Sequence, residues 1–254
     1  MNLNNGLITS INFTAEWQIY VCLVAFVLIG IVCAYLCGSI NSAIIISKVL
    51  YRDDIRKYGS GNAGMTNMLR TFGGRAAVLT LLGDLLKTVL AIFITGVLLG
   101  FHYAGGISFG DGYCYIAGLF AMLGHIFPIY YGFKGGKGVL ATATVALVLA
   151  PIPFLILFAT FAAIVAASKY VSLGSVCAAI LFPVVVNGYC SLLFGFTPGY
   201  ISLSTILIAI IIVWCHRENL KRISTKTERK LSFGKKEKEV IATEDSSEST
   251  SDEQ

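Results

Sequence analysis

The chain has 254 residues, of which 56% are hydrophobic and 13% are charged, and its formal net charge is +5. Soluble globular proteins contain roughly 45–50% apolar and about 25% charged residues. This composition excludes a soluble globular protein and predicts an integral membrane protein, because several spans of ~20 apolar residues would use most of the chain. We therefore relate the positive charge to membrane topology and expect no nucleic-acid partner.

Long apolar runs predict an all-α integral membrane protein with about seven transmembrane helices. The expected spans are Trp17–Cys37, Ala76–Phe101, Tyr113–Tyr131, Val139–Ala150, Ile152–Ser168, Leu173–Phe194 and Tyr200–Cys215. The fourth run is short, and Pro151 and Pro153 indicate a tight turn between it and the fifth. Five or six spans remain the alternative, if these two segments merge or insert only part of the way.

The distribution of Lys and Arg predicts the orientation. Apart from Lys87, all of these residues fall in four segments: 48–75, 134–137, 169 and 217–238. The other connecting segments contain neither residue: 1–16, 102–112, 151–153 and 195–199. With seven spans the two sets alternate sides, so the positive-inside rule places the N-terminus outside and the C-terminus in the cytoplasm. We expect one membrane domain over residues 1–216 and a basic, then acidic, largely disordered tail over residues 217–254.

A glycine-rich segment at residues 54–70 predicts a phosphate-binding loop. Its glycines free the backbone to curl, so that successive N–H groups point into one concavity. These glycines are Gly59, Gly61 and Gly64, and the short polar side chains between and after them are Ser60, Asn62, Thr66 and Asn67. Positive charge surrounds the loop at Arg56, Lys57, Arg70 and Arg75. The alternative is an ordinary basic loop, which would not need small polar residues packed between the glycines.

A second segment, residues 124–138, again combines glycines with cations on the same expected side. It contains His125 at the end of a span, followed by Lys134 and Lys137 in a Gly-rich run. The run lacks the spacing of a Walker loop, and Gly138 stands where that motif needs Ser or Thr, so nucleotide hydrolysis has no support. For His125, a structural role in capping the helix end and a functional role are equally compatible with the sequence.

Two further polar groups lie at span ends on the same side. Ser172 follows Lys169 in a turn before the sixth span, and His216 and Asn219 share a helix face directly after the seventh. Asp84 and Lys87 lie inside the second span, where we interpret them as a structural ion pair. No segment has the His, Cys and carboxylate spacing of a metal site, so we expect neither a metal nor a cofactor.

These segments resemble the bacterial glycerol-3-phosphate acyltransferases that take their acyl group from acyl phosphate. The resemblance covers roughly residues 30–225 and rests on four motifs in this order: GSINSA (38–43), DIRKYGSGNAGMTNMLRTFG (54–73), GHIFPIYYGFKGGKGV (124–139) and HRENLKRI (216–223). Asn41 stands where the family often has Pro, and Met65 where Ala is common. The GSGN-x-G-x-TN core and the GGKG run are characteristic of that family.

The resemblance implies transfer of a fatty acyl group from acyl phosphate to the sn-1 hydroxyl of glycerol 3-phosphate. The products would be lysophosphatidic acid and phosphate, in the first step of phospholipid synthesis. It also implies a monomeric, multi-pass protein of the bacterial cell membrane (inner or plasma membrane) whose active site faces the cytoplasm. Its partners would be acyl phosphate, glycerol 3-phosphate and membrane lipid.

The family's motif positions imply three groups of site residues here. Those expected to be catalytic are Ser60, Arg70, His216 and Asn219. Those expected to bind the phosphate of acyl phosphate are Gly59, Gly61, Asn62, Thr66 and Asn67. Those expected to bind glycerol 3-phosphate are His125, Lys134, Lys137 and Ser172. The proton of the attacking hydroxyl would pass to His216 or to a phosphate oxygen of the substrate.

Three other functions agree less well with the sequence. Acyltransferases that use acyl-CoA or acyl carrier protein have a His-x-x-x-x-Asp pair, and no His in this chain is followed by Asp at that spacing. An anion or lipid transporter would need polar residues deep in several spans, whereas only Asp84 and Lys87 lie there. A non-catalytic scaffold would not need cationic, Gly-rich loops at separated sites.

Overall fold

The computed structural model describes residues 7–11, 14–100 and 109–231, and within these ranges it contains helices and no strands. The α-helices are α1 (Glu16–Ser39), α2 (Ser42–Tyr51), α3 (Met65–Phe72), α4 (Gly74–Leu99), α5 (Phe109–Ile126), α6 (Val139–Leu149), α7 (Pro151–Ser168), α8 (Val171–Phe194), α9 (Gly199–Cys215) and α10 (Arg217–Ser224). Three 3₁₀ turns cover Ile8–Ser10, Ile55–Lys57 and Ile129–Tyr131. The protein is therefore an all-α membrane protein, as the sequence predicts.

Each expected span coincides with one helix: α1, α4, α5, α6, α7, α8 and α9. Five helical segments of the described chain are long and apolar enough to cross a bilayer, and a sixth qualifies if α9 and α10, bent by 51°, form one span. The helix α6 has only 11 residues, which at 1.5 Å per residue is about half the thickness of a bilayer core. The count of seven full spans therefore remains a prediction.

The long helices form one bundle with an apolar outer surface. Trp17, Tyr20 and Val24 of α1 are more than half exposed, as are many apolar side chains of α4 and α7, which suits contact with lipid. Small residues let α1 and α5 pack closely: a Cβ on Gly38 would lie 2.0 Å from the carbonyl oxygen of Ala121, and one on Gly124 would lie 2.2 Å from that of Tyr35. Close backbone packing at small residues is typical of membrane helices.

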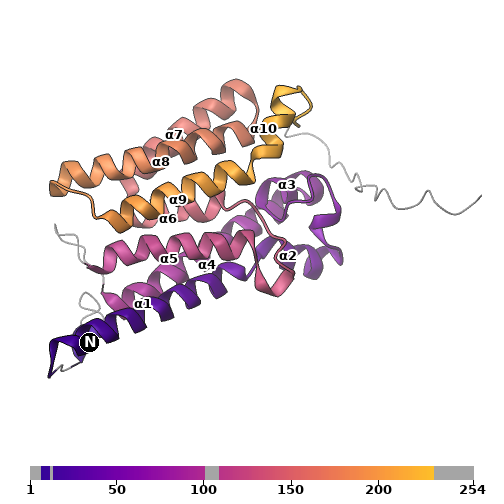
Figure 1. Cartoon of the computed structure of the whole chain (residues 1–254). Helices are drawn as coiled ribbons and strands as arrows, with labels where there is room; N and C mark the ends of the chain where they lie inside the picture. Colours follow the sequence, from indigo (N-terminus) through magenta and orange to yellow (C-terminus); the bar gives the residue numbers. More distant parts are fainter. Residues whose placement is uncertain (1–6, 12–13, 101–108, 232–254) are drawn as a thin grey trace, which may run out of the picture.

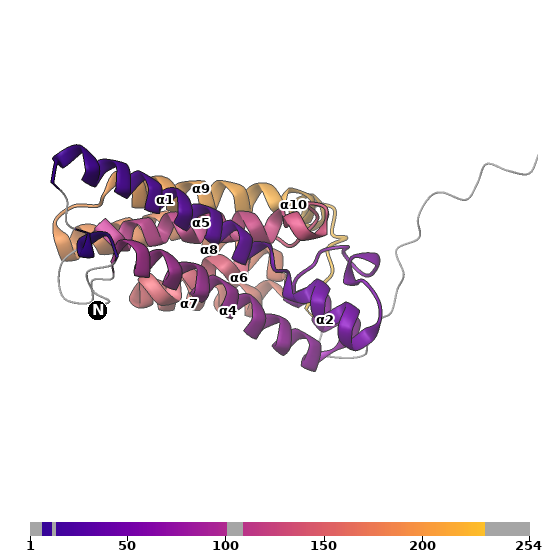
Figure 2. The same cartoon turned by 90° about the horizontal axis from the view of Figure 1, so that it is seen from below.

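The short helices α2, α3 and α10 gather at one end of the bundle (Figures 1 and 2). The chain reaches this end at a break after α1, where the side chain of Asn41 accepts a hydrogen bond from the backbone N–H of Ile44 and caps α2. Except for Lys87, every Lys and Arg of the described chain belongs to these helices, to the first turn of α4 or to the loops at this end. The basic segments thus gather on a single face of the bundle.

The first part of the predicted tail, residues 217–231, is structured. Residues 217–224 form α10, and the chain then turns back until the N–H of Leu231 donates to the carbonyl oxygen of Lys169 (2.7 Å). We predicted a tail here from the hydrophilic composition, whereas residues 217–231 contact the bundle in the structure. The predicted disorder of residues 232–254 lies outside the described residues.

Candidate active site

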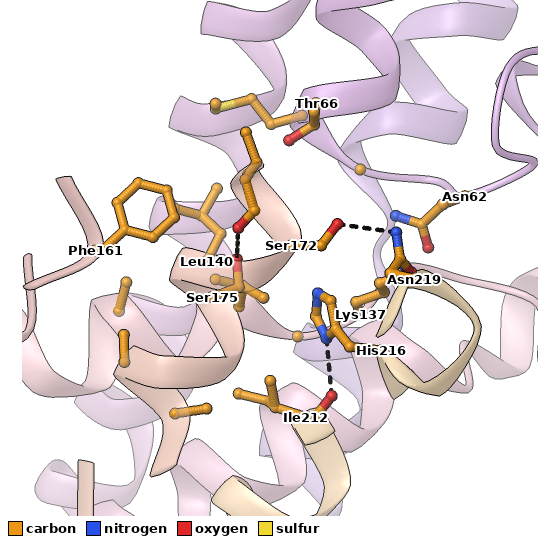
Figure 3. A pocket seen from close by; sticks show the side chains of 18 of the residues that line it. Asn62, Thr66, Lys137, Leu140, Phe161, Ser172, Ser175, Ile212, His216 and Asn219 are labelled. Carbon is orange, nitrogen blue, oxygen red and sulfur yellow. Dashed lines mark hydrogen bonds between the residues drawn. The ribbon is translucent and has the colours of Figure 1, made fainter. Parts of the chain in front are cut away.

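A cavity of about 800 Å³ opens at the basic end of the bundle. Its inner part lies among α6, α7 and α8 and is apolar, with walls from Leu140, Ala143, Phe158, Phe161 and Phe182. Its outer part is polar and is formed by side chains from four separate segments (Figure 3). These segments are the glycine-rich loop before α3, the run before α6, the start of α8 and the region around α10.

The glycine-rich loop is wound around the buried side chain of Asn67. The Asn67 amide nitrogen donates to the carbonyl oxygens of Ile55 (3.3 Å), Tyr58 (3.0 Å) and Asn62 (3.0 Å), and its oxygen accepts from the N–H of Ser60 (3.3 Å). Gly59 and Gly61 have φ values of 60° and 68°, in the left-handed region that glycine adopts without strain. Asn67 therefore fixes the shape of the loop.

Helix α3 turns two polar side chains toward the cavity. Thr66 and Arg70 are four residues apart, share one face of α3 and both line the cavity. Arg70 also donates from Nη2 to the carbonyl oxygen of Arg229 (3.1 Å). This bond links the loop side of the cavity to the segment that follows α10.

Arg56, which we expected near the phosphate, instead joins two loops outside the cavity lining. Its guanidinium pairs with Asp54 (2.7 Å) and donates to the carbonyl oxygens of Tyr131 (2.9 Å) and Lys134 (3.3 Å). Burial opposes the ionisation of Asp54, but the hydrogen bonds from Arg56 outweigh it and hold the pKa of this carboxyl below its ordinary value. Arg56 thus acts as a clamp between the two glycine-containing segments.

The Gly135–Gly138 segment lies back along the end of α5. The N–H of Gly136 donates to the carbonyl oxygen of His125 (3.0 Å), and that of Gly135 to the carbonyl oxygen of Ile126 (3.1 Å). The N–H of Ala63 donates to the carbonyl oxygen of Gly135 (3.3 Å), so this segment also supports the glycine-rich loop. Lys137 extends from it into the polar part of the cavity.

A continuous hydrogen-bond network joins three of the four segments. Lys137 donates to the side-chain oxygen of Asn219, and the Asn219 amide nitrogen donates to Oγ of Ser172 (2.9 Å) and to Oε1 of Glu228 (2.7 Å). Ser172 also donates to Oε1 of Glu228 (2.5 Å), and Arg222 donates to Oε2 (2.8 Å). Glu228 therefore holds the serine, the amide and the guanidinium in fixed positions.

The charges of this network depend on its partial burial. Burial, followed by the nearby charge of Arg222, lowers the pKa of Lys137 to about 8. Burial opposes the ionisation of Glu228, but hydrogen bonds from Ser172 and Asn219 outweigh it and keep the pKa of Glu228 below its ordinary value. Near neutral pH the polar part of the cavity thus contains a lysine cation that a phosphate can pair with.

His216 lies at the junction between α9 and α10 and is buried (4% exposed). Its Nδ1 lies 2.8 Å from the carbonyl oxygen of Ile212. Because a carbonyl oxygen only accepts hydrogen bonds, Nδ1 must carry the proton, and the neutral ring then has a free electron pair on Nε2. Figure 3 shows this second nitrogen on the side of the ring away from Ile212. His216 can therefore accept a proton from a group in the cavity.

His125 is also buried, in a cluster with Asp84 and Lys87. The Lys87 ammonium lies 2.8 Å from Oδ1 of Asp84 and 2.9 Å from Nδ1 of His125. Asp84 and His125 both line the cavity, whereas Lys87 does not. The ion pair of Asp84 and Lys87 expected from the sequence is present, and His125, which we had assigned to substrate binding, lies beside it.

The structure brings most of the expected site residues to one cavity. Its lining includes Gly59, Ser60, Asn62, Thr66, Asn67, Arg70, His125, Lys137, Ser172, His216 and Asn219. Gly61 and Lys134 lie outside this lining. Sequence reasoning missed Arg222 and Glu228, because we assigned both to a tail. A carboxylate placed among many cations just after the last span was the signal available for Glu228.

Comparison with known proteins identifies close relatives. The family model described as "Glycerol-3-phosphate acyltransferase" matches residues 28–226. Proteins named glycerol-3-phosphate acyltransferase include one from Finegoldia magna, 40% identical over 205 residues (81% of this chain and 96% of that protein). One from Syntrophomonas wolfei is 42% identical over 203 residues (80% of this chain and 95% of that protein).

Two solved structures share this fold. Both are described as PlsY (YgiH), an integral membrane glycerol 3-phosphate acyltransferase. Its glycerol 3-phosphate form has a TM-score of 0.69 and 33% identity, covering 81% of this chain and 96% of that one. Its lysophosphatidic acid form has a TM-score of 0.66 and 31% identity, covering 82% and 96%.

Proposed function

Because this chain belongs to the glycerol-3-phosphate acyltransferase family, we propose that it transfers a fatty acyl group from acyl phosphate to the sn-1 hydroxyl of glycerol 3-phosphate. The products are lysophosphatidic acid and phosphate. The observation that carries this proposal is the single cavity with a cationic, hydrogen-bonding outer part and an apolar inner part. Such a cavity suits a reaction that joins a phosphate-bearing alcohol to a lipid chain.

The two parts of the cavity suggest where each substrate binds. The acyl chain lies in the apolar part among α6, α7 and α8, so that its activated carbonyl reaches the polar part. We assign the phosphate of acyl phosphate to the glycine-rich loop: Gly59, Ser60, Asn62, Thr66, Asn67 and Arg70. Glycerol 3-phosphate binds opposite, near His125, Lys137 and Ser172. Gly61 contributes the loop's turn, and Lys134 adds positive charge on the same face of the protein.

The reaction needs no covalent enzyme intermediate, because acyl phosphate is already activated. The sn-1 oxygen attacks the carbonyl carbon, the new C–O bond forms, and the bond from that carbon to the phosphate oxygen breaks. The proton of the hydroxyl passes either to Nε2 of His216 or to a phosphate oxygen of the substrate. Loop N–H groups, Arg70 and Lys137 stabilise charge on the carbonyl oxygen and the departing phosphate. Positioning of the reactants can itself lower the barrier by ~7–11 kcal/mol.

The distribution of charge supports a cytoplasmic active site. The polar part of the cavity lies at the end of the bundle where the Lys and Arg residues gather, and such residues favour the cytoplasmic side. We therefore infer that the chain lies in the bacterial cell membrane (inner or plasma membrane) with its cavity open to the cytoplasm. We further propose that the protein functions as a monomer, because the cavity of one chain is lined by residues assigned to both substrates.

Phosphate release from palmitoyl phosphate by the purified, detergent-solubilised protein tests the proposed function. The assay compares reactions with and without glycerol 3-phosphate and follows lysophosphatidic acid in parallel. We expect phosphate release that depends on glycerol 3-phosphate, with an equal amount of lysophosphatidic acid. Turnover with palmitoyl-CoA and none with palmitoyl phosphate, in folded protein, would refute the proposed donor. His216→Asn should lower kcat by about 10²–10⁴ if Nε2 is the proton acceptor.

A further inference from the structure

The cluster of Asp84, Lys87 and His125, here called the Lys87 cluster, is more than an ion pair. The three side chains come from α4 and α5 and are each at most 5% exposed. A pair of opposite charges would by itself meet the need to neutralise Asp84 within the membrane. Lys87, however, also binds two groups outside its own helix.

The Lys87 ammonium forms an ion pair with Asp84 and lies within hydrogen-bond distance of two further acceptors. These acceptors are Oδ1 of Asp84 (2.8 Å), Nδ1 of His125 (2.9 Å) and the carbonyl oxygen of Ile40 (3.0 Å). Because the ammonium only donates, Nδ1 of His125 accepts and Nε2 carries the proton of the neutral ring. The cluster therefore fixes both the position and the tautomer of His125.

Because His125 also contacts Gly136, its fixed position restrains the segment that carries Lys137. The His125 carbonyl oxygen accepts from the N–H of Gly136 (3.0 Å). The His125 ring lies so close to Gly136 that a Cβ there would be 2.0 Å from Nε2. A rotation of the ring toward Gly136 would therefore displace the residue directly before Lys137.

The contact with Ile40 passes a second constraint to the glycine-rich loop. Ile40 lies at the break between α1 and α2, next to Asn41. The buried side chain of Asn41 donates to the carbonyl oxygen of Ala63 (3.4 Å), and the N–H of Ala63 donates to the carbonyl oxygen of Gly135 (3.3 Å). Through His125 and Ile40, the Lys87 ammonium thus fixes the positions of both glycine-containing segments relative to each other.

We propose that Lys87 is a positioning residue for acyl transfer: through His125 and Ile40 it holds the segment that places Lys137 against glycerol 3-phosphate. This inference rests on the proposed role of Lys137 in binding that substrate. It assigns Lys87 an effect on the reaction without contact between Lys87 and the reactants. It differs from a purely structural ion pair, which would affect the stability of the bundle and leave substrate binding in the folded protein unchanged.

A double-mutant cycle between Lys87→Met and Lys137→Ala separates these two roles. The KM for glycerol 3-phosphate, the KM for the acyl donor, kcat and the melting temperature are measured for both single variants and the double variant. We expect Lys87→Met to raise the KM for glycerol 3-phosphate at least tenfold, with the KM for the acyl donor changed less than threefold. In the Lys137→Ala background the same substitution should change the KM for glycerol 3-phosphate less than threefold.

Thr95→Val is the matched control, because Thr95 is buried in the same helix and donates to Ala91 within α4, at the end away from the site. It should leave both KM values unchanged in either background. The proposal is overturned if Lys87→Met lowers only the melting temperature, or if it raises the KM by the same factor in both backgrounds.

Removal of one partner from a buried ion pair is strongly destabilising, so a second variant keeps the test decisive. His125→Phe retains the pair of Asp84 and Lys87 and the backbone bond to Gly136 but removes the contact between Lys87 and the ring, and it should give the same non-additive result with Lys137→Ala. An additive result would overturn the proposal here too. The cycle uses whichever acyl donor the wild-type protein accepts. A failure of acyl phosphate as donor therefore refutes the proposed function without deciding the role of Lys87.

Discussion

Gly136→Ala should disable the site without any change of charge. An added Cβ would lie 2.0 Å from Nε2 of His125 and 2.9 Å from the carbonyl oxygen of Ala63, whereas ordinary contacts are 3.4–4 Å. Lys87 holds the His125 ring and a backbone bond holds Ala63, so the glycine segment must move. The separation from Nε2 must grow by about 1.4 Å to reach 3.4 Å.

A displacement of ~1 Å in a positioning element can lower the rate about a hundredfold, and overpacking typically costs ~1–3 kcal/mol of stability. We therefore expect kcat/KM for glycerol 3-phosphate to fall about a hundredfold, with a modest fall in melting temperature. Steady-state kinetics in detergent and a thermal unfolding curve measure both quantities. Gly74→Ala is the control, because a Cβ there has no atom within 4 Å. Activity of Gly136→Ala within threefold of wild type would refute the close packing on which this reasoning depends.

Three further predictions follow from the cavity. Since Lys137 has a pKa of about 8 and must be charged to bind phosphate, kcat/KM should fall as the pH rises through about 8. Lys137→Arg should remove this fall, because a guanidinium stays protonated; an unchanged pH profile would contradict the role of Lys137. Arg70→Ala should raise the KM of a phosphate substrate roughly tenfold to a hundredfold, since it removes a charge-assisted bond of ~1.5–3 kcal/mol; unaltered kinetics would refute the phosphate role of that loop. Ala143→Leu, which narrows the apolar part of the cavity, should lower kcat/KM more for palmitoyl phosphate than for decanoyl phosphate, and equal losses would place the chain elsewhere.

The helices were predictable because each apolar run must satisfy its own backbone in lipid. A run of suitable length could therefore be assigned to a helix without knowledge of its neighbours. The first span was predicted to end at Cys37, close to the break at Ile40–Asn41, but the helix α2 that follows this break was not predicted. The break depends on the cap that Asn41 provides and on the bond from Lys87 to Ile40. These are local and tertiary contacts that hydropathy does not record.

The part of the candidate site that was predictable is formed by polar residues that lie close together in the sequence. Gly59, Asn62 and Asn67 stand together in the sequence, and they fold into one loop because Asn67 bonds to the backbone only a few residues away. Glu228 could not be placed in this way. Its partners Ser172 and Asn219 become neighbours only after the chain turns back behind α10. A polar sequence after the last span looks the same whether it forms a tail or returns to the bundle.

The short length of α6 is related to the position of Lys137, which lies just before this helix. Residues Gly135–Gly138 run back beside α5, and a Cβ on Gly138 would lie 2.5 Å from Met122 and 3.2 Å from Ile126. The chain therefore packs against the bundle as irregular backbone before the 11 residues of α6 begin. Irregular backbone at membrane depth is tolerated only where protein or a cavity surrounds it. By this route Lys137 comes close to the apolar part of the cavity, where an acyl group and a phosphate can meet.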